Sequence, residues 1–187
     1  MAIPFNDIKK IKVGQYTILS NVYQAIYEAS KKYDVPLSYM LAMAAKESNF
    51  DPDAKATTSS ATGLYQFIKK TWDDMWKDSK VKPSPTDPFA SADAGARFVK
   101  QIQNKLNTSE SAWLYLGHFL GPNGAFDLLT AFKNNPETLI DIIVNKKQLD
   151  ANRSVFYHTD GTLKSVQDIY NWSNNSITNI IDKLKIV

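Results

Sequence analysis

The sequence contains no cysteine and only two histidines, His118 and His158, which are widely separated. The absence of cysteine excludes disulfide bonds, thiol nucleophiles and zinc sites with cysteine ligands. Two separated histidines make a metal site built by the protein itself unfavourable. We therefore expect neither a metal ion nor a cofactor.

Long apolar runs and a strong excess of one charge are also lacking. No stretch approaches the roughly 18 apolar residues of a membrane span, and residues 1–16 lack the apolar core of a signal peptide. We expect no stable membrane insertion and no export by the usual signal. The 22 Lys and Arg residues against 19 Asp and Glu leave a net charge of +3, far below that of a dedicated nucleic-acid-binding protein. No nucleic-acid partner is expected.

The chain shows no repeat, no low-complexity segment and no long Gly/Ser linker. With 187 residues, of which 43% are hydrophobic and 12% aromatic, it is long enough to bury one substantial core. We expect a monomer in which residues 19–187 form a single domain and residues 1–18 an N-terminal arm.

Apolar residues recur at helical spacing, and almost no stretch alternates with the period of two that is typical of strands. The pattern predicts an all-α fold. Leu19, Val22 and Ile26 mark one face of a first helix, which must end near Pro36. A second helix is predicted from Leu37 to Ser48, and it is apolar nearly all round, as expected for a helix inside a core.

Capping residues and breakers predict the remaining helices. Thr71 is a candidate cap for a short helix with Asp73 and Asp74 in its first turn, and Asp87-Pro88 begins another helix that carries Val99, Ile102 and Leu106 inward. Further helices are predicted at 110–120, 124–133, 137–145 and 165–184, with breaks at Gly121-Pro122, at 134–136 and at 173–176.

Glu47 is the most informative single residue. Met40, Met43 and Ala44 precede it by seven, four and three positions, respectively, so their apolar face continues onto Glu47. Lys46 lies about 100° away around the helix. Burial and the negative end of the helix dipole both raise the pKa of a carboxyl group placed there, as a general acid requires. On periodicity alone, a glutamate that reaches solvent from a frayed helix end is the commoner interpretation.

The segment ESNFDPDAKATTSSATGLYQF, at residues 47–67, favours the catalytic interpretation. It resembles the lytic transglycosylase and goose-type lysozyme superfamily in five features that occur in order. These are the pair Glu47-Ser48, the aromatic Phe50, the turn Asp51-Pro52, the Ser/Thr-rich loop from Thr57 to Thr62, and the sequence Gly63-Leu64-Tyr65-Gln66. The preceding VPLSYMLAMAAK fits the first core helix of that family. The resemblance implies a lysozyme-like, soluble lytic transglycosylase type of helical fold with Glu47 as the catalytic acid.

The resemblance also suggests substrate contacts. Ser48, Thr57 and Gln66 occupy positions whose hydroxyl or amide groups bind sugar substituents or orient the glutamate, and such groups donate and accept hydrogen bonds without adding charge. Tyr65, Phe67 and Tyr157 are candidates for aromatic walls against pyranose rings. Each of these aromatic residues is equally well explained as a member of the core.

A second block, TSESAWLYLGHFLGPNGA at residues 108–125, falls where the family has Ala-Tyr-Asn-Ala-Gly-Pro. Gly121-Pro122 sets the register, so His118 replaces the tyrosine and Phe119 the asparagine. His118 is then either a cleft residue or a hydrogen-bonded core histidine. The variant His-Phe-Leu-Gly and the tail from Ala125 to Ile177 are similar to phage-encoded cell-wall enzymes. We therefore expect synthesis in a host cytoplasm and action in the periplasm or cell wall, either as an endolysin or on a virion.

Three classes of function follow. The first is cleavage of peptidoglycan glycan strands between N-acetylmuramic acid and N-acetylglucosamine, either without water, giving 1,6-anhydromuramoyl ends, or by hydrolysis as in a muramidase. The second is an inactive structural or wall-binding phage component. The third, a helical DNA-binding protein, lacks a basic recognition helix. Hydrolysis normally needs a second carboxylate, and each nearby aspartate already has a structural explanation: Asp51, Asp53, Asp73, Asp74, Asp87 and Asp93.

Overall fold

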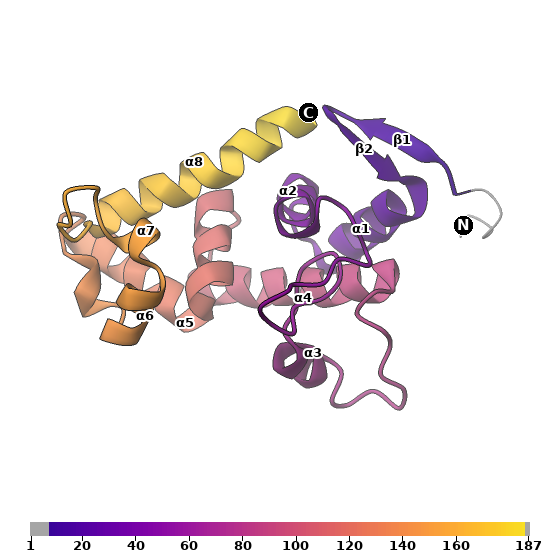
Figure 1. The fold of residues 1–187 in the computed structure, drawn as a ribbon, viewed down its shortest axis with the longest axis horizontal. Helices are drawn as coiled ribbons and strands as arrows, with labels where there is room; N and C mark the ends of the chain where they lie inside the picture. The colour runs from indigo at the N-terminus through magenta and orange to yellow at the C-terminus, as the bar shows by residue number, and fades with distance from the viewer. Residues whose placement is uncertain (1–7, 186–187) are drawn as a thin grey trace. The chain divides into compact units, whose positions relative to one another are not determined.

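The computed structural model describes residues 8–185, which are mostly helical with one small two-stranded sheet (Figure 1). The predicted all-α class is confirmed, with the hairpin as an addition. The elements in chain order are β1 (Lys10–Val13), β2 (Tyr16–Leu19), α1 (Ser20–Tyr33), α2 (Leu37–Ser48), α3 (Lys69–Met75), α4 (Pro88–Leu106), α5 (Ser111–Asn134), the 3-10 helix η2 (Ile140–Ile142), α6 (Lys146–Ala151), α7 (Arg153–Phe156) and α8 (Val166–Leu184).

The chain divides into two compact units. Unit 1 contains residues 1–100 and 179–187, and unit 2 contains residues 101–178. Helices α4 and α8 each contribute residues to both units. Within residues 8–185, no helix combines the length and the apolar composition needed to cross a membrane.

Helix α2 is the centre of the core of unit 1. All residues from Tyr39 to Ala44 are at most 1% exposed, which confirms the prediction of a helix that is apolar nearly all round. The helix has the predicted bounds, Leu37–Ser48. Val22 and Ile26 of α1 are also fully buried. Helix α1 ends at Tyr33, where Asp34 adopts a left-handed conformation before Pro36.

Residues 8–18 of the predicted arm contain most of an antiparallel hairpin in which Lys10 pairs with Leu19 and Val13 with Tyr16. The ring of Tyr16 packs edge-on against Phe50 with 5.4 Å between ring centroids. The Gln15 amide donates a hydrogen bond of 2.9 Å to the Lys183 carbonyl. These two contacts attach the hairpin to the rest of unit 1. Residues 1–7 of the predicted arm lie outside the described residues.

The predicted start of α3 at Thr71 is wrong, because the helix begins at Lys69. The Lys69 amide donates to the hydroxyl of Ser60, nine positions earlier in the chain, at 3.0 Å. A side chain from the preceding loop therefore satisfies a helix N-terminus that has no local cap. Asp73 is not a first-turn residue but pairs with Lys69 at 2.6 Å and Lys82 at 2.7 Å.

The predicted start of α4 is confirmed. Pro88 is the first helical residue, and the Asp87 carboxylate accepts a 2.8 Å hydrogen bond from the Ala90 amide, as an N-cap residue does. Val99, Ile102 and Leu106 are buried as expected.

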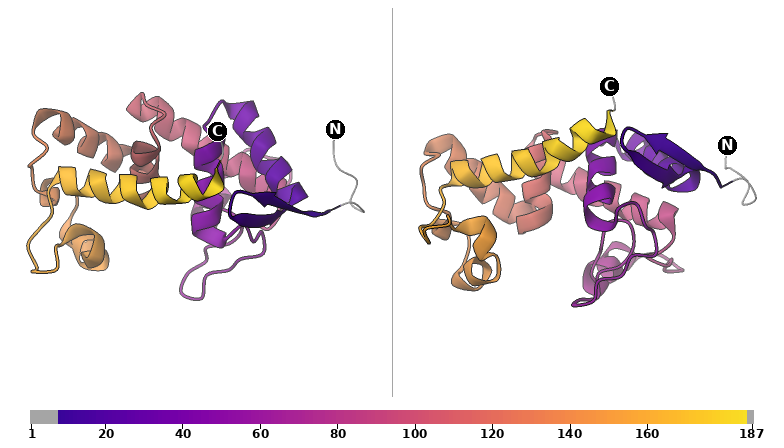
Figure 2. Two further views of the ribbon diagram at one scale, coloured as in Figure 1. Left: turned by 90° about the horizontal axis from the view of Figure 1, so that it is seen from above. Right: turned by 45° about the horizontal axis from the view of Figure 1, so that its top comes forward.

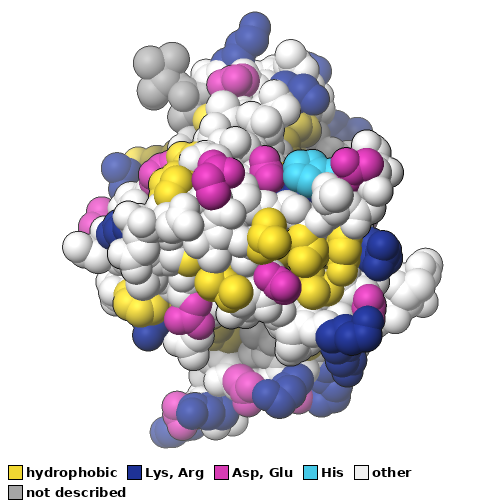
Figure 3. All heavy atoms as spheres, turned by 90° about the vertical axis from the view of Figure 1, so that its left-hand side faces the viewer, with side chains coloured by type: hydrophobic (Ala, Val, Ile, Leu, Met, Phe, Trp, Pro, Cys, Tyr) yellow, Lys and Arg dark blue, Asp and Glu magenta, His cyan; other side chains and the backbone are white. Residues whose placement is uncertain are grey.

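Unit 2 is built on α5 and an aromatic cluster. The expected break at Gly121-Pro122 appears as a kink, with Gly121 at φ 77° and ψ 161° inside α5. The ring of Phe119 lies 5.2 Å from that of Trp172 and 5.8 Å from that of Phe156. One face of the molecule exposes hydrophobic side chains (Figure 3), and the exposed hydrophobic residues of this unit include Leu139 and Ile142.

Two helix predictions in unit 2 are wrong. The segment 137–145 contains only η2 as helix, because Ile140 donates to the Lys164 carbonyl and Val166 to the Thr138 carbonyl. Helix α8 runs unbroken through 173–176 (Figure 2). Its Ser173 is fully buried and donates a 2.7 Å hydrogen bond to the Ala112 carbonyl, so a polar residue is satisfied inside the unit. Helices α6 and α7 were not predicted.

Candidate active site

Helix α2 ends directly after the pair Glu47-Ser48. Asn49 and Phe50 both take left-handed backbone angles, with φ 51° and 64°. Their amides donate to the carbonyls of Ala45 at 3.0 Å and Ala44 at 3.1 Å, which closes the helix. Two successive non-glycine residues in this region are unusual and occur preferentially where the surrounding structure fixes them, as at functional sites.

Glu47 is half-buried at this helix end, whereas Lys46 beside it is exposed. Burial raises the pKa of the Glu47 carboxyl group above its ordinary value, and the positive charge of Lys46 partly opposes the shift. The direction agrees with the prediction from periodicity. A carboxyl group with a raised pKa holds its proton closer to neutral pH and can donate it as a general acid.

Ser48 joins the helix end to the turn that follows. Its hydroxyl lies 3.0 Å from the Ala44 carbonyl, one turn back in α2, and 3.0 Å from the Leu64 carbonyl. This side chain therefore fixes the segment Gly63–Gln66 next to the end of α2. A contact between Ser48 and a sugar stays a prediction.

The loop that connects α2 to α3 is held by its own hydrogen bonds. The Gly63 amide donates to the Ala54 carbonyl at 2.9 Å, and the Thr62 amide donates to the Phe67 carbonyl at 3.2 Å. The Gln66 side-chain amide donates to the carbonyls of Ala54 at 3.1 Å and Gly63 at 2.9 Å. Both amide protons are used within the loop, so the side-chain oxygen of Gln66 is the atom left for a substrate hydroxyl.

Thr57 lies in the same loop and is exposed. Two backbone hydrogen bonds close the loop around Thr57 and Gln66. The Ala56 amide donates to the Ala61 carbonyl, and the Thr62 amide donates to the Phe67 carbonyl. The structure therefore places Thr57 at the accessible end of this loop, and its contact with substrate stays a prediction.

Tyr65 and Phe67 are members of the core of unit 1. Tyr65 is 3% exposed, and its hydroxyl donates to the Met40 carbonyl at 3.2 Å. Burial raises the pKa of this phenol far above its ordinary value. Phe67 packs against Trp72 and Phe98 and lines one side of a cavity of about 390 Å³. Packing in the core accounts for the burial of both aromatic residues, and their contact with a sugar ring stays a prediction.

The other predicted site residues belong to unit 2. Burial lowers the pKa of His118 to about 4, so the imidazole is neutral at neutral pH. Phe119 is part of the aromatic cluster described above. Tyr157 lies under the guanidinium of Arg153, which sequence reasoning did not select. The spacing of four residues between Arg153 and Tyr157 is the signal that could have identified this pair.

Five of the six aspartates considered as second carboxylates form structural contacts through their side chains, namely Asp51, Asp73, Asp74, Asp87 and Asp93. Asp93 contacts Lys32 at 2.6 Å and Arg97 at 3.0 Å. Asp51 accepts a hydrogen bond from the Asp53 amide. Asp87 caps α4, while Asp73 and Asp74 pair with lysines of α3 and the following loop. In the described part of the chain, no group of three His, Asp or Glu side chains is arranged to hold a metal ion.

Comparison with models of protein families identifies the family of this chain. The family model described as the Transglycosylase SLT domain matches residues 24–138, more than half of the chain. The chain belongs to this family. The segment of this chain that the SLT domain model matches includes Glu47, the loop up to Phe67 and the block around His118. Tyr157 lies beyond it.

The fold is similar to that of a solved structure, the lytic transglycosylase Slt from Pseudomonas aeruginosa, determined as an inactive mutant with glutamine in place of a glutamate. The TM-score is 0.51 and the sequence identity 18%, over 84% of this chain and 25% of that chain. This SLT domain chain therefore spans about a quarter of the length of Slt. At this identity the likeness shows a common fold.

Proposed function

We propose that this protein cleaves the glycan strands of peptidoglycan between N-acetylmuramic acid and N-acetylglucosamine, with Glu47 as the acid and then the base. The observation that carries the proposal is the half-buried Glu47, whose pKa burial raises, at the end of the buried helix α2 in an SLT domain. Slt supports it, because the inactive form of that protein carries a glutamate-to-glutamine replacement.

The reaction needs one carboxyl group. Protonated Glu47 donates its proton to the glycosidic oxygen while the bond between that oxygen and the anomeric carbon of muramic acid breaks. The 6-hydroxyl of the same muramic acid then attacks the anomeric carbon, and the Glu47 carboxylate accepts the hydroxyl proton. The product is a 1,6-anhydro ring, no water is consumed, and Glu47 regains its proton.

The contacts of the nearby aspartates favour this route over hydrolysis. A hydrolase normally requires a second carboxylate about 5–5.5 Å from the acid as a nucleophile, or about 6.5–9.5 Å away to activate water. Asp73 and Asp93 are each held by two cations, and Asp51 and Asp87 accept backbone hydrogen bonds. These contacts account for four of the nearby aspartates without a catalytic role.

The test is to digest purified peptidoglycan in water labelled with ¹⁸O and to analyse the fragments by mass spectrometry. We expect 1,6-anhydromuramoyl ends without label, and no fragments from the Glu47→Gln variant. Reducing muramic acid ends that carry one labelled oxygen would reject transglycosylation in favour of a muramidase. Absence of any fragment from the unmodified chain would reject enzymatic activity in favour of a wall-binding component.

We also propose that the protein acts on peptidoglycan in the periplasm or cell wall during phage infection. The replacement of the family's Tyr-Asn by His118-Phe119 and the tail beyond residue 125 support this setting. A turbidity assay on permeabilised cells of candidate hosts tests it, and a chain that clears none of them would contradict it.

A further inference from the structure

Unit 2 contains an open pocket that lies outside the segment matched by the family model. It has a volume of about 430 Å³ and is lined by Arg153, Ser154, Tyr157, His158, Thr159 and Gly161. A cavity of this size is within the range of small-molecule sites. Its lining combines one guanidinium, one phenol ring, an imidazole and the hydroxyl groups of a serine and a threonine, and it contains no acidic side chain.

Arg153 is the principal charged group of the pocket. Its guanidinium carbon lies 4.3 Å from the centroid of the Tyr157 ring, a distance at which the ring face attracts and orients a cation. Within residues 8–185, Arg153 has no acidic partner among the salt bridges formed. The planar guanidinium of this exposed arginine can therefore donate to an external anion.

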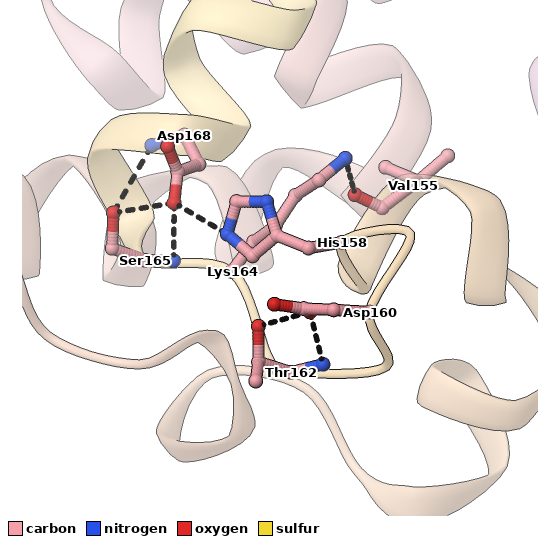
Figure 4. A network of polar contacts seen from close by, with 7 residues as sticks. All are labelled: Val155, His158, Asp160, Thr162, Lys164, Ser165 and Asp168. Atoms are coloured by element: carbon pink, nitrogen blue, oxygen red, sulfur yellow. Dashed lines mark hydrogen bonds and ion pairs between the residues drawn. The ribbon is translucent and has the colours of Figure 1, made fainter.

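Two acids, Asp160 and Asp168, lie close to the pocket residues, and Figure 4 shows the contacts that they form. Asp160 accepts hydrogen bonds from the Thr162 amide at 2.9 Å and the Thr162 hydroxyl at 2.7 Å. Asp168 accepts from the Ser165 amide and hydroxyl, both at 3.0 Å, and lies 3.3 Å from the His158 imidazole. Figure 3 likewise shows a histidine at the surface beside acidic side chains. Within residues 8–185, neither carboxylate forms a salt bridge with Arg153.

The loop that forms one wall of the pocket is closed by its own hydrogen bonds. Tyr157 forms a backbone bridge with Leu163, and the His158 amide donates to the Thr162 carbonyl at 2.9 Å. The Lys164 ammonium donates to the Val155 carbonyl at 2.9 Å, which ties the end of the loop to α7. A pocket formed before its ligand arrives loses less entropy on binding than one that must fold around it.

We propose that this pocket binds a carboxylate carried by a muramic acid residue, with Arg153 pairing the carboxylate and Ser154 and Thr159 contacting sugar or acetamido groups. The identity of the ligand rests on the proposed function, since peptidoglycan is the substrate assigned there. The carboxylate has two sources, the free lactyl group of a strand without peptides and the stem peptide of an intact strand. The pocket is then a second contact with the cell wall.

The experiment is a titration of the ¹⁵N-labelled full chain, followed by NMR at the amides of residues 153–161. N-acetylmuramic acid supplies a lactyl carboxylate, N-acetylmuramoyl-L-alanyl-D-isoglutamine a peptide carboxylate, and N-acetylglucosamine the same ring without either. We expect saturable shifts with one or both of the first two ligands and binding at least about tenfold weaker for N-acetylglucosamine. Response to the first ligand alone assigns the lactyl source, and response to the second alone assigns the peptide source.

Arg153→Gln is expected to raise the Kd at least about tenfold. Lys147→Gln, which removes one charge from an exposed side chain of α6, is expected to leave it unchanged. Equal binding of N-acetylglucosamine, equal binding by Arg153→Gln, or no shift at these amides would overturn the proposal. None of these ligands contains a glycan bond to cleave. A chain that binds through Arg153 but releases no glycan fragments would reject the proposed function alone.

Discussion

Glu47 is a carboxyl group on which burial and a neighbouring cation act in opposite directions. Burial disfavours the charged form, and Lys46 favours it. Because the pKa is raised in the folded chain, ionisation of Glu47 costs stability, and that cost grows as the pH rises through the folded pKa. The raised pKa on which the proposed acid catalysis relies therefore weakens the fold at neutral pH.

Replacement of Glu47 by Gln should separate catalysis from stability. We expect cleavage to fall by several orders of magnitude, because an amide cannot donate the proton. The melting temperature at pH 7 should rise, since the neutral amide avoids the cost of a buried charge, whereas at pH 4 the two proteins should melt alike. Retention of more than about a tenth of the activity would exclude Glu47 as the acid.

The pH dependence of cleavage should have an alkaline limb set by Glu47, on which activity falls as the proton is lost. Lys46→Gln removes the charge that lowers the pKa of Glu47, so this limb should move to higher pH in the variant. Rates measured from about pH 5 to 9 test the shift, with Lys147→Gln as a control for a distant exposed charge. A limb that stays in place in Lys46→Gln would assign it to another group.

His118 should make the fold sensitive to acid. Its pKa falls from an ordinary value of 6.5 to about 4 on folding, so between these values the unfolded chain binds more protons. Stability is then complete above about pH 6.5 and declines toward pH 4, by at most about 1.4 kcal/mol per pH unit. Urea denaturation at several pH values should show this decline reduced in His118→Gln and retained in His158→Gln. An unchanged pH dependence in His118→Gln contradicts the assignment.

At the level of elements, the end of α2 that carries Glu47 depends on the turn that follows it. Gly63 has φ +83°, and a Cβ atom at this position would lie 2.0 Å from the Pro85 carbonyl oxygen. The turn therefore packs closely against Pro85, which lies in the segment before α4. The Ser48 hydroxyl forms a hydrogen bond to the Leu64 carbonyl of the same turn. Together these contacts fix the position of Gln66 relative to the helix end.

Gly63→Ala should therefore destabilise the protein by at least about 2 kcal/mol, because both the backbone angle and the contact with Pro85 must change. Gly161→Ala is the matched control, since Gly161 has a similar φ of +87° with nothing within 4 Å of an added Cβ atom. Its cost should be about 1–2 kcal/mol, from the backbone angle alone. Urea denaturation of both variants measures the difference in the free energy of unfolding. Equal decreases in the two variants would show that Pro85 can move away from the added Cβ atom without loss of stability.

For the molecule as a whole, the proposed reaction uses one carboxyl group and no bound ion. Cleavage by the full chain should therefore be unchanged by an excess of EDTA, measured as the release of soluble fragments from purified peptidoglycan. Peptidoglycan stripped of divalent ions beforehand is the control for effects on the substrate. Activity that disappears with EDTA and returns with an added divalent cation would require a different mechanism.

Much of the fold and part of the candidate site could be predicted because the signals are local. The bounds of α2, the cap at Asp87 and the break at Gly121 follow from residues within one or two helical turns. The same holds for Glu47, whose burial follows from its spacing to Met40 and Met43. Tyr65 was harder, since a buried aromatic side chain and a sugar-binding one have the same local sequence signature.

The sequence by itself determined the helical class, the central helix and a half-buried acid at its end, since periodicity and caps act between neighbouring residues. The tertiary structure decided where α3 begins, why 137–145 is not a long helix and why α8 passes unbroken through 173–176. In each case the deciding hydrogen bond joins groups far apart along the chain, namely Ser60 to Lys69, Ile140 to Lys164 and Ser173 to Ala112. A polar group takes whichever partner the fold brings to it, and local sequence does not encode that partner.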